Sequence, residues 1–444
     1  MMDLVVRNAR LRWCTEPRDI GIDGGVIRSV GPALEEKGRE EIDAAGHLTT
    51  SPLCDPHLHL DAALSVGDPR YNESGTLLEG IRIWGERKSG LTRQVIVDNA
   101  VEAVLWEFAN GVQFIRTHAD ATDPKLLTVK ALLEVKDRVK DLVDIQIVAF
   151  PQDGVFTTPD GEKLMRRAMD IGADVVGGIP HNEFTREDGV RDVEFAFALA
   201  ERHSAMIDIH CDETGDDQSR FVEVMAKLAI AGGMGERVTA SHATAMHNYN
   251  NDYAFKLLGV AKRAKMNFIT NPFDNSVLQN RTDGYPRRRG HTRVDEMTER
   301  SVNVCIGHDS IMDPWYPMGK GSMLQAANLL MHTAHMSGFG QIGALFDMIT
   351  DNSARTLQVE DRYGIAPGRP ANLVVFDAEN EFDAIRLGSE CLFVIRGGAV
   401  ALRTVPARRS LDFAGFRRDV DFRASVPVGA SPGRTPGGDR KSVV

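Results

Sequence analysis

The sequence contains few cysteines and no long apolar run. Its five cysteines are odd in number among 444 residues, and none forms a Cys-x-x-Cys pair. This usage is typical of reduced cysteines in a cytosolic protein and argues against a disulfide framework. No window approaches about 18 uninterrupted apolar residues, so no membrane span is predicted. The N-terminus also lacks a cationic segment leading into an apolar one, so no secretory signal is expected.

An excess of positive charge is also absent. The chain has 52 Lys and Arg against 63 Asp and Glu, a net charge of -11. This balance offers no track for a polynucleotide, and 42% hydrophobic and 26% charged residues are ordinary for a soluble globular protein. We therefore expect a cytoplasmic protein that binds neither nucleic acid nor membrane.

Short apolar runs separated by tight turns mark both ends of the chain. Near the start, Asp23-Gly24-Gly25 between such runs is typical of a hairpin turn. Gly397-Gly398 near the other end likewise indicates a turn between two strands. Because chain ends often lie close together, residues 1–50 and 364–412 are expected to form one small β-sandwich domain rather than two unrelated flaps.

The last part of the chain changes character. Residues 413–444 are expected to form a C-terminal tail. From Val426 the sequence is dense in Pro and Gly without apolar periodicity, so the tail is predicted to be mobile at least from 426.

The middle of the chain, residues 51–363, alternates apolar strand-like runs with amphipathic helical stretches. Including the run before His57, eight strands are predicted; the other seven are Phe114–His118, Asp144–Phe150, Val175–Ile179, Met206–His210, Val238–His242, Asn267–Asn271 and Val302–His308. Helices are predicted between them, for example over Leu126–Val139, Gly161–Ile171 and Phe221–Ala231. Eight βα units predict a (β/α)8 TIM barrel. The alternative, an open doubly wound sheet, requires a phosphate-binding glycine fingerprint after the first strand, which is absent.

Polar side chains stand near the C-terminal ends of the predicted strands. They are His57, His59, His118, Gln152, His181, His210, His242 and Asp309. In a barrel, all strand C-termini open onto one face, and that face carries the chemistry. Residues distant in sequence are therefore expected to converge on one pocket.

Four of these residues form a candidate metal site. His57 and His59 are two residues apart on a strand, so their rings share a face, roughly 7 Å apart along the backbone, and can reach one ion. His210 and Asp309 each follow a later apolar run. Three imidazoles and one carboxylate suit zinc or iron and leave one position for water.

Five spaced motifs surround these residues: Pro56-His57-Leu-His59-Leu-Asp61, Ile147-Val-Ala-Phe-Pro151-Gln152, His210-Cys-Asp-Glu213, Thr239-Ala-Ser-His242, and Gly307-His308-Asp309 followed by Asp313-Pro-Trp315. Together they resemble the bacterial cytosine deaminases of the amidohydrolase superfamily, over about residues 50–400. The resemblance implies a deaminase that binds one Fe²⁺ or Zn²⁺ per subunit through His57, His59, His210 and Asp309. It also implies a homo-oligomer, because members of that family commonly assemble.

The resemblance also implies a single metal ion. Binuclear relatives use a lysine on the fourth strand as a bridging carbamate. Here the corresponding stretch is expected to end in Phe150-Pro151-Gln152, which offers no lysine. His118 and His181 match no ligand position and are interpreted as structural or supporting residues.

Catalytic roles follow from the same resemblance. Glu213 would protonate a ring nitrogen, His242 would polarise the attacking water, and Asp309 would pass that water's proton to the leaving amine. Gln152 would bind the lactam-like edge of a pyrimidone, since its amide both donates and accepts. Trp315 could close the pocket and exclude water.

One residue departs from the family pattern. The related deaminases read His-Asp-Asp where this chain has His308-Asp309-Ser310. Serine is smaller and uncharged, so the change is expected to open space and remove an anion beside the substrate. We hypothesise that the enzyme accepts a 5-substituted cytosine such as 5-methylcytosine.

Other functions are kept as alternatives. The same machinery could deaminate another cyclic amidine, such as creatinine or an aminopurine (isoguanine). A dihydropyrimidinase-like hydrolase is disfavoured because the bridging lysine is missing, and a barrel that lost its chemistry is disfavoured because all four ligands are present. Zinc deaminases that edit nucleic acids use Pro-Cys-x-x-Cys, which this chain lacks. The expected substrate is a free small molecule.

Overall fold

The computed structural model describes residues 1–422, and the part of the expected tail from 423 onward lies outside the described residues. The chain divides into two compact units. One consists of Ser51–Ser337 with Ala344–Gly364, and the other of Met1–Thr50, Gly338–Gly343 and the described residues after Gly364.

The larger unit contains eight parallel strands in chain order. They are β6 (Leu53–Leu58), β7 (Val112–Asp120), β8 (Asp144–Phe150), β9 (Val175–Gly178), β10 (Met206–Cys211), β11 (Val238–His242), β12 (Asn267–Thr270) and β13 (Asn303–Ile306). A bridge between Leu58 and Asp309 joins the last strand's end to the first. Each predicted strand is present, so the TIM barrel is confirmed and the open sheet is wrong.

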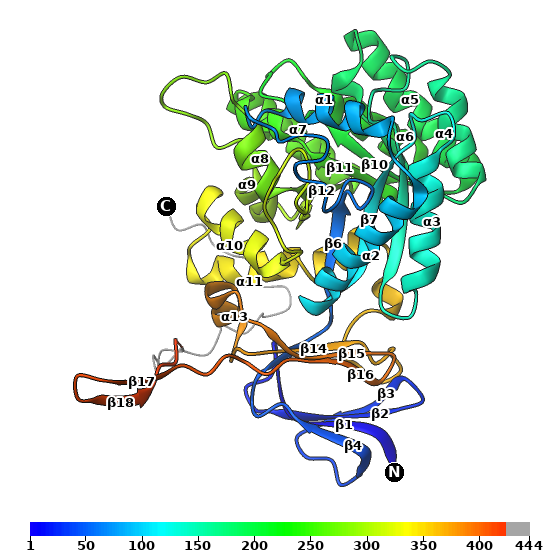
Figure 1. The fold of residues 1–444 in the computed structure, drawn as a ribbon. Helices are drawn as coiled ribbons and strands as arrows, with labels where there is room; N and C mark the ends of the chain where they lie inside the picture. The colour runs from blue at the N-terminus through cyan, green and yellow to red at the C-terminus, as the bar shows by residue number, and fades with distance from the viewer. Residues whose placement is uncertain (423–444) are drawn as a thin grey trace. The chain divides into compact units, whose positions relative to one another are not determined.

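Helices follow the strands and lie outside them (Figure 1). They are α1 (Leu77–Lys88), α2 (Arg93–Ala109), α3 (Leu127–Val139), α4 (Gly161–Asp170), α5 (Arg186–His203), α6 (Phe221–Gly232), α7 (Asn251–Ala264), α8 (Pro272–Leu278), α9 (Val294–Glu299), α10 (Met323–Thr333), α11 (Phe339–Met348) and α12 (Asp351–Thr356), with short 3-10 turns at Pro180–Asn182, Gly235–Arg237, Thr244–Asn248 and Glu360–Arg362. The predicted helices match α3, α4 and α6 to within one residue at each end. Polar caps define several starts; the Thr92 and Asn250 side chains, for example, accept the Val95 and Tyr253 amides.

The smaller unit combines strands from both chain ends. They are β1 (Met2–Leu11), β2 (Arg18–Asp23), β3 (Val26–Gly31), β4 (Gly38–Asp43), β5 (Leu48–Thr50), β14 (Leu373–Phe376), β15 (Cys391–Arg396) and β16 (Ala399–Arg403), together with helix α13 (Glu381–Leu387). Strand β5 links the two sets, because it pairs with both β1 and β14. In Figure 1 strands β14 to β16 form a layer beside β1 to β4. Leu4, Ile22, Leu373 and Ile395 share one buried core, so the predicted fold class is confirmed.

Two Gly-Gly turns shape this unit as the sequence predicts. Gly24 and Gly25 have φ of 59° and 73°, and Gly397 and Gly398 have φ of 56° and 82°. Positive φ at both central residues matches the twist of a two-residue hairpin, and glycine adopts it without strain.

A regular hairpin spans residue 413, where the tail is predicted to begin. Strands β17 (Ser410–Phe413) and β18 (Phe416–Asp419) pair antiparallel around Ala414-Gly415. Both turn residues have positive φ, 53° and 85°, which is the geometry of a tight hairpin. The hairpin ends before residue 426, and the prediction of a mobile tail from that residue falls outside the described part of the chain.

None of the helices in residues 1–422 combines the length and the apolar character that a membrane span requires.

Candidate functional site

The closure of the barrel brings Asp309 beside the first strand. The Asp309 amide donates to the His57 carbonyl at 2.8 Å, and the His59 amide donates to the Asp309 carbonyl at 2.9 Å. Buried Asp55 adds a second clamp, since its Oδ1 accepts the amides of His57 and His308. These bonds hold the carboxylate of Asp309 between two imidazoles from the far end of the barrel sequence.

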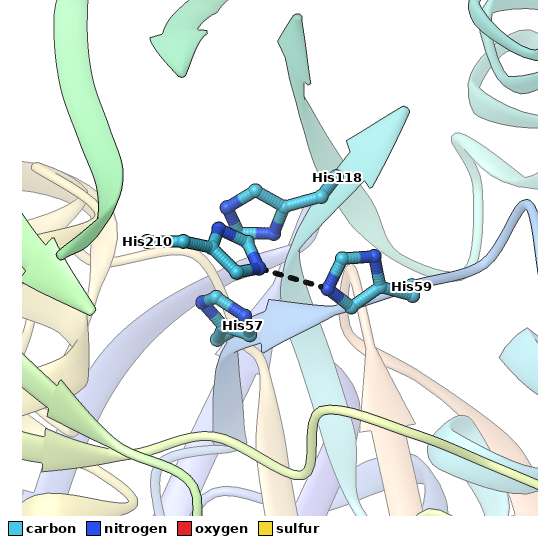
Figure 2. A group of neighbouring side chains, drawn as sticks. All are labelled: His57, His59, His118 and His210. Atoms are coloured by element: carbon cyan, nitrogen blue, oxygen red, sulfur yellow. Dashed lines mark hydrogen bonds between the residues drawn. The ribbon is translucent and has the colours of Figure 1, made fainter. Parts of the chain in front are cut away.

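The four predicted metal ligands converge. His57 Nε2 and His59 Nε2 lie 3.5 and 3.4 Å from Asp309 Oδ1, and His59 Nε2 lies 3.1 Å from His210 Nε2. Figure 2 shows the imidazoles gathered with their rings facing one another. Ligand atoms bound at about 2.1 Å in a tetrahedron lie about 3.4 Å apart, so these separations fit one ion.

The protonation of these rings also fits a cation. Burial lowers the pKa values of His57, His59 and His210 well below their usual range, which keeps the rings neutral, as metal ligation requires. His57 Nε2 has no hydrogen-bond partner in the part of the chain that the structure describes. Burial also raises the pKa of Asp309, the expected behaviour of a carboxyl that lacks a compensating charge.

His118 belongs to the same cluster, although the sequence suggested only a supporting place. Its ring centroid lies 4.1 Å from that of His57 and 4.6 Å from that of His210. Its ring nitrogens lie close enough to those of His57, His59 and His210 to share an ion with them. His118 Nε2 also lies 3.8 Å from Asp208 Oδ1, a buried carboxylate behind the cluster.

Strand β8 ends in an aromatic residue that packs on His210, and no bridging lysine is found there. Phe150, at the end of β8, stacks on the His210 ring with centroids 4.1 Å apart. Strand β8 is the third of the barrel, so the assignment of its end to the fourth strand is wrong. The fourth strand, β9, ends before Ile179-Pro180-His181 and also lacks a lysine.

Glu213 and His242 meet at the edge of this cluster. His242 Nδ1 lies 3.6 Å from Glu213 Oε1 and 3.8 Å from Asp309 Oδ2. The side chain of Gln279 donates to Glu213 Oε1 at 3.1 Å, and Asn275 Nδ2 lies 2.9 Å from His242 Nδ1. Burial raises the pKa of Glu213 to about 8, against the lowering effect of Gln279, so Glu213 carries a proton at neutral pH. Burial lowers the pKa of His242.

One pocket connects the candidate catalytic residues with the candidate substrate-binding residues. Its lining consists of His59, Leu77, Gln152, His210, Glu213, His242, Asp274, Leu278, Asp309, Ser310 and Trp315. Trp315 is buried against Trp84 and Leu278, and its backbone is held because Asp313 Oδ1 accepts the Trp315 amide. His181 is not among the lining residues.

Asp274 and its neighbours on α8 were not identified as site residues from the sequence. The Asp274 carboxylate lines the pocket and its Oδ2 accepts a hydrogen bond from Ser310 Oγ at 2.8 Å. The pocket wall beside Ser310 therefore contains an acidic group from another element, Asp274 on α8. A signal was available, since Asp274 follows the end of β12 as the other polar site residues follow their strands.

The sequence pattern of the amidohydrolase family matches residues 40–402, and the chain belongs to this family. It is therefore an enzyme of the amidohydrolase superfamily, whose deaminases bind a divalent metal ion.

More specific similarities lie within the same superfamily. The structure of 5-methylcytosine deaminase from Klebsiella pneumoniae, liganded with 5-fluorocytosine, shares 45% sequence identity with a TM-score of 0.89, covering 91% of this chain and 98% of that chain. N-isopropylammelide isopropyl amidohydrolase from Pseudomonas sp. (strain ADP) is 29% identical over 90% of this chain and 97% of its own length. Pterin deaminase from Rhizobium rhizogenes is 24% identical over 89% of this chain and 90% of its own length.

Proposed function

We propose that this enzyme deaminates a free cytosine-type base hydrolytically, yielding the uracil-type product and ammonia. The observation that carries the proposal is the single pocket that Gln152, Glu213, His242 and Asp309 line together with imidazoles that could hold a metal ion. The 45% identity to a 5-methylcytosine deaminase across nearly the whole chain supports the same class of substrate.

The residues present suit a divalent metal ion, either iron or zinc. His57, His59, His210 and Asp309 would hold it, and when bound it would lower the pKa of the attacking water towards neutrality. Iron and zinc accept the same nitrogen and oxygen ligands, so the chemistry of the donors fits both.

The protein side chains would manage the protons of the reaction. Glu213, protonated at neutral pH, would donate to a ring nitrogen as water attacks the adjacent carbon. His242 lies between Glu213 and Asp309 and would orient the attacking water. Asp309 Oδ2 points towards His242 while Oδ1 faces the imidazoles, so Oδ2 would carry a proton to the leaving amine.

Binding of the base would rely on Gln152 and Trp315. Gln152 is 7% exposed and lines the pocket, where its amide can donate to and accept from a lactam-like ring edge. Trp315 lies with its ring centroid 6.3 Å from that of His59 and would shield the reacting atoms from bulk water.

Ammonia release by the metal-loaded enzyme tests the proposal. The panel contains cytosine, 5-methylcytosine, isoguanine, creatinine, pterin and N-isopropylammelide, so that the alternative cyclic amidines compete directly. We expect the cytosines to give the highest kcat/KM. Glu213→Gln should lower kcat by about 100-fold or more with unchanged metal content. The proposal fails if no cytosine is deaminated.

A substitution at Ser310 tests the preference for a substituent at C5. A buried methyl group gains only about 0.8 kcal/mol, so attraction alone would shift selectivity only several-fold, whereas relief of a clash would do more. We expect Ser310→Asp to lower kcat/KM for 5-methylcytosine much more than for cytosine. Unchanged selectivity would show that position 310 does not face C5.

A further inference from the structure

The wall of the pocket formed by Ser310 and Asp274 contains a polar atom without a partner. Asp274 is 3% exposed, and its Oδ1 has no hydrogen-bond partner among residues 1–422. Its other oxygen is occupied by Ser310 Oγ. Burial, followed by the nearby charge of Asp313, raises the pKa of Asp274 well above its usual range. A buried polar group of this kind is costly unless a ligand completes its hydrogen bonds.

The position of this wall indicates which ring edge it meets. Ser310 follows directly after Asp309, the residue assigned to the amine that leaves C4. C4 of a cytosine is flanked by the ring nitrogen assigned to Glu213 on one side and by C5 on the other. A substituent on C5 would therefore point towards Ser310 and Asp274.

We propose that Asp274 makes the enzyme selective for cytosines whose C5 substituent can form hydrogen bonds, with hydroxymethyl as the fitting group. This inference rests on the proposed function and deepens it by assigning the substituent. A methyl group would fill the space beside Ser310 but leave Oδ1 unpaired. A hydroxyl both donates and accepts, so it can pair with Oδ1 whether or not Asp274 carries a proton.

Two variants of similar volume separate polarity from shape. Asp274→Asn can still accept from Ser310 and leaves a polar group facing the substrate, whereas Asp274→Leu removes both functions. We expect wild type to favour 5-hydroxymethylcytosine over 5-methylcytosine by about tenfold in kcat/KM. The preference should persist in Asp274→Asn, although weakened, and should vanish or reverse in Asp274→Leu.

Binding of products provides a readout that does not depend on turnover. 5-Hydroxymethyluracil and thymine are compared as inhibitors or by calorimetry, with metal content and circular dichroism confirming that each variant is folded and loaded. Asp274→Leu should weaken 5-hydroxymethyluracil by about tenfold and leave thymine unchanged or tighter. Ser310→Ala is the neighbouring control, since it keeps the Asp274 carboxyl and should retain the preference for the hydroxymethyl group.

The outcomes distinguish this inference from the proposed function. If wild type deaminates cytosine but treats the two 5-substituted bases alike, the inference is overturned and the deaminase stands. The inference is also overturned if Asp274→Leu weakens both products equally, because Asp274 would then bind a group common to all substrates. If no cytosine reacts or binds, the proposed function itself fails.

Discussion

His57 is held by a chain of three buried polar side chains. Its Nδ1 lies 3.1 Å from Ser241 Oγ, Ser241 donates to Asp208 Oδ1 at 2.5 Å, and Arg116 donates to Asp208 Oδ2 at 2.9 Å. Because the hydroxyl proton of Ser241 is directed at Asp208, its oxygen can accept the Nδ1 proton of His57. This tautomer leaves Nε2 as a lone-pair donor, the form that binds a metal ion.

Ser241→Ala removes the acceptor that fixes this tautomer and should lower the affinity for zinc by about 10- to 100-fold. Competition with a chromogenic chelator measures the affinity. Thr244→Ser serves as a control, because Thr244 lies in the next turn and its hydroxyl bonds backbone carbonyls outside the cluster. Equal zinc affinity in Ser241→Ala and wild type would mean that Ser241 does not set the tautomer.

Two candidate catalytic residues have left-handed backbone. His242 has φ of 66° and Asp309 has φ of 72°, and neither is glycine. Residues with a β-carbon occupy this region at a cost and persist where the surrounding structure enforces it. At Asp309 the enforcing contacts are the two backbone bonds to His57 and His59. The strain thus accompanies the placement of its carboxylate.

Helix α1 packs against the Trp315 side of the pocket through a glycine. A β-carbon at Gly80 would lie 2.6 Å from Trp315 Cδ1 and 2.9 Å from its Nε1, so only glycine lets α1 approach the indole this closely. Gly85, on the same helix, has nothing within 4 Å of such a carbon.

Gly80→Ala should displace Trp315 and lower kcat/KM for cytosine by about tenfold or more, because small misplacements in a site are costly. Gly85→Ala is the matched control: it gains the same helix propensity, about 0.5–1 kcal/mol, without touching the indole. Steady-state kinetics and tryptophan fluorescence check both variants. If the two variants have the same activity, the contact does not matter to the pocket.

The barrel strands could be predicted from the sequence, whereas the part that α8 takes in the site could not. Apolar runs such as residues 147–150 of β8 are continuous because parallel barrel strands are buried on both sides, and this makes the strands recognisable. Helix α8 has only seven residues, Pro272–Leu278, too few for an apolar period to reveal which side faces inward. The pattern of α8 therefore does not reveal that Asp274 and Asn275 face the site, and only their position after the end of β12 points to it.

The larger unit buries several carboxyl groups. Burial raises the pKa of Asp61 to about 7 and that of Asp192 to about 8. Asp192, on α5, accepts the Ile179 amide through Oδ2 at 2.9 Å, and its Oδ1 has no partner among the described residues. Folding therefore binds protons, and the stability of the protein depends on pH.

Asp192→Asn should make stability less dependent on pH. The Asp192 carboxyl loses its proton at about pH 4 in the unfolded chain and at about pH 8 in the folded chain. Its contribution is therefore complete below about pH 4 and is lost as pH rises to about 8. Asparagine keeps the bond to Ile179 without this loss. Between about pH 5 and 9, wild type should lose stability relative to the variant, on the order of a few kcal/mol.

Urea unfolding at several pH values measures this difference, with Glu187→Gln as the control. Glu187 lies on the same helix but is exposed, so its replacement should leave the pH profile of wild type unchanged. Parallel profiles for wild type and Asp192→Asn would mean that Asp192 titrates alike in the folded and unfolded chains. Other buried carboxyl groups, such as that of Asp61, would then have to account for any dependence of stability on pH.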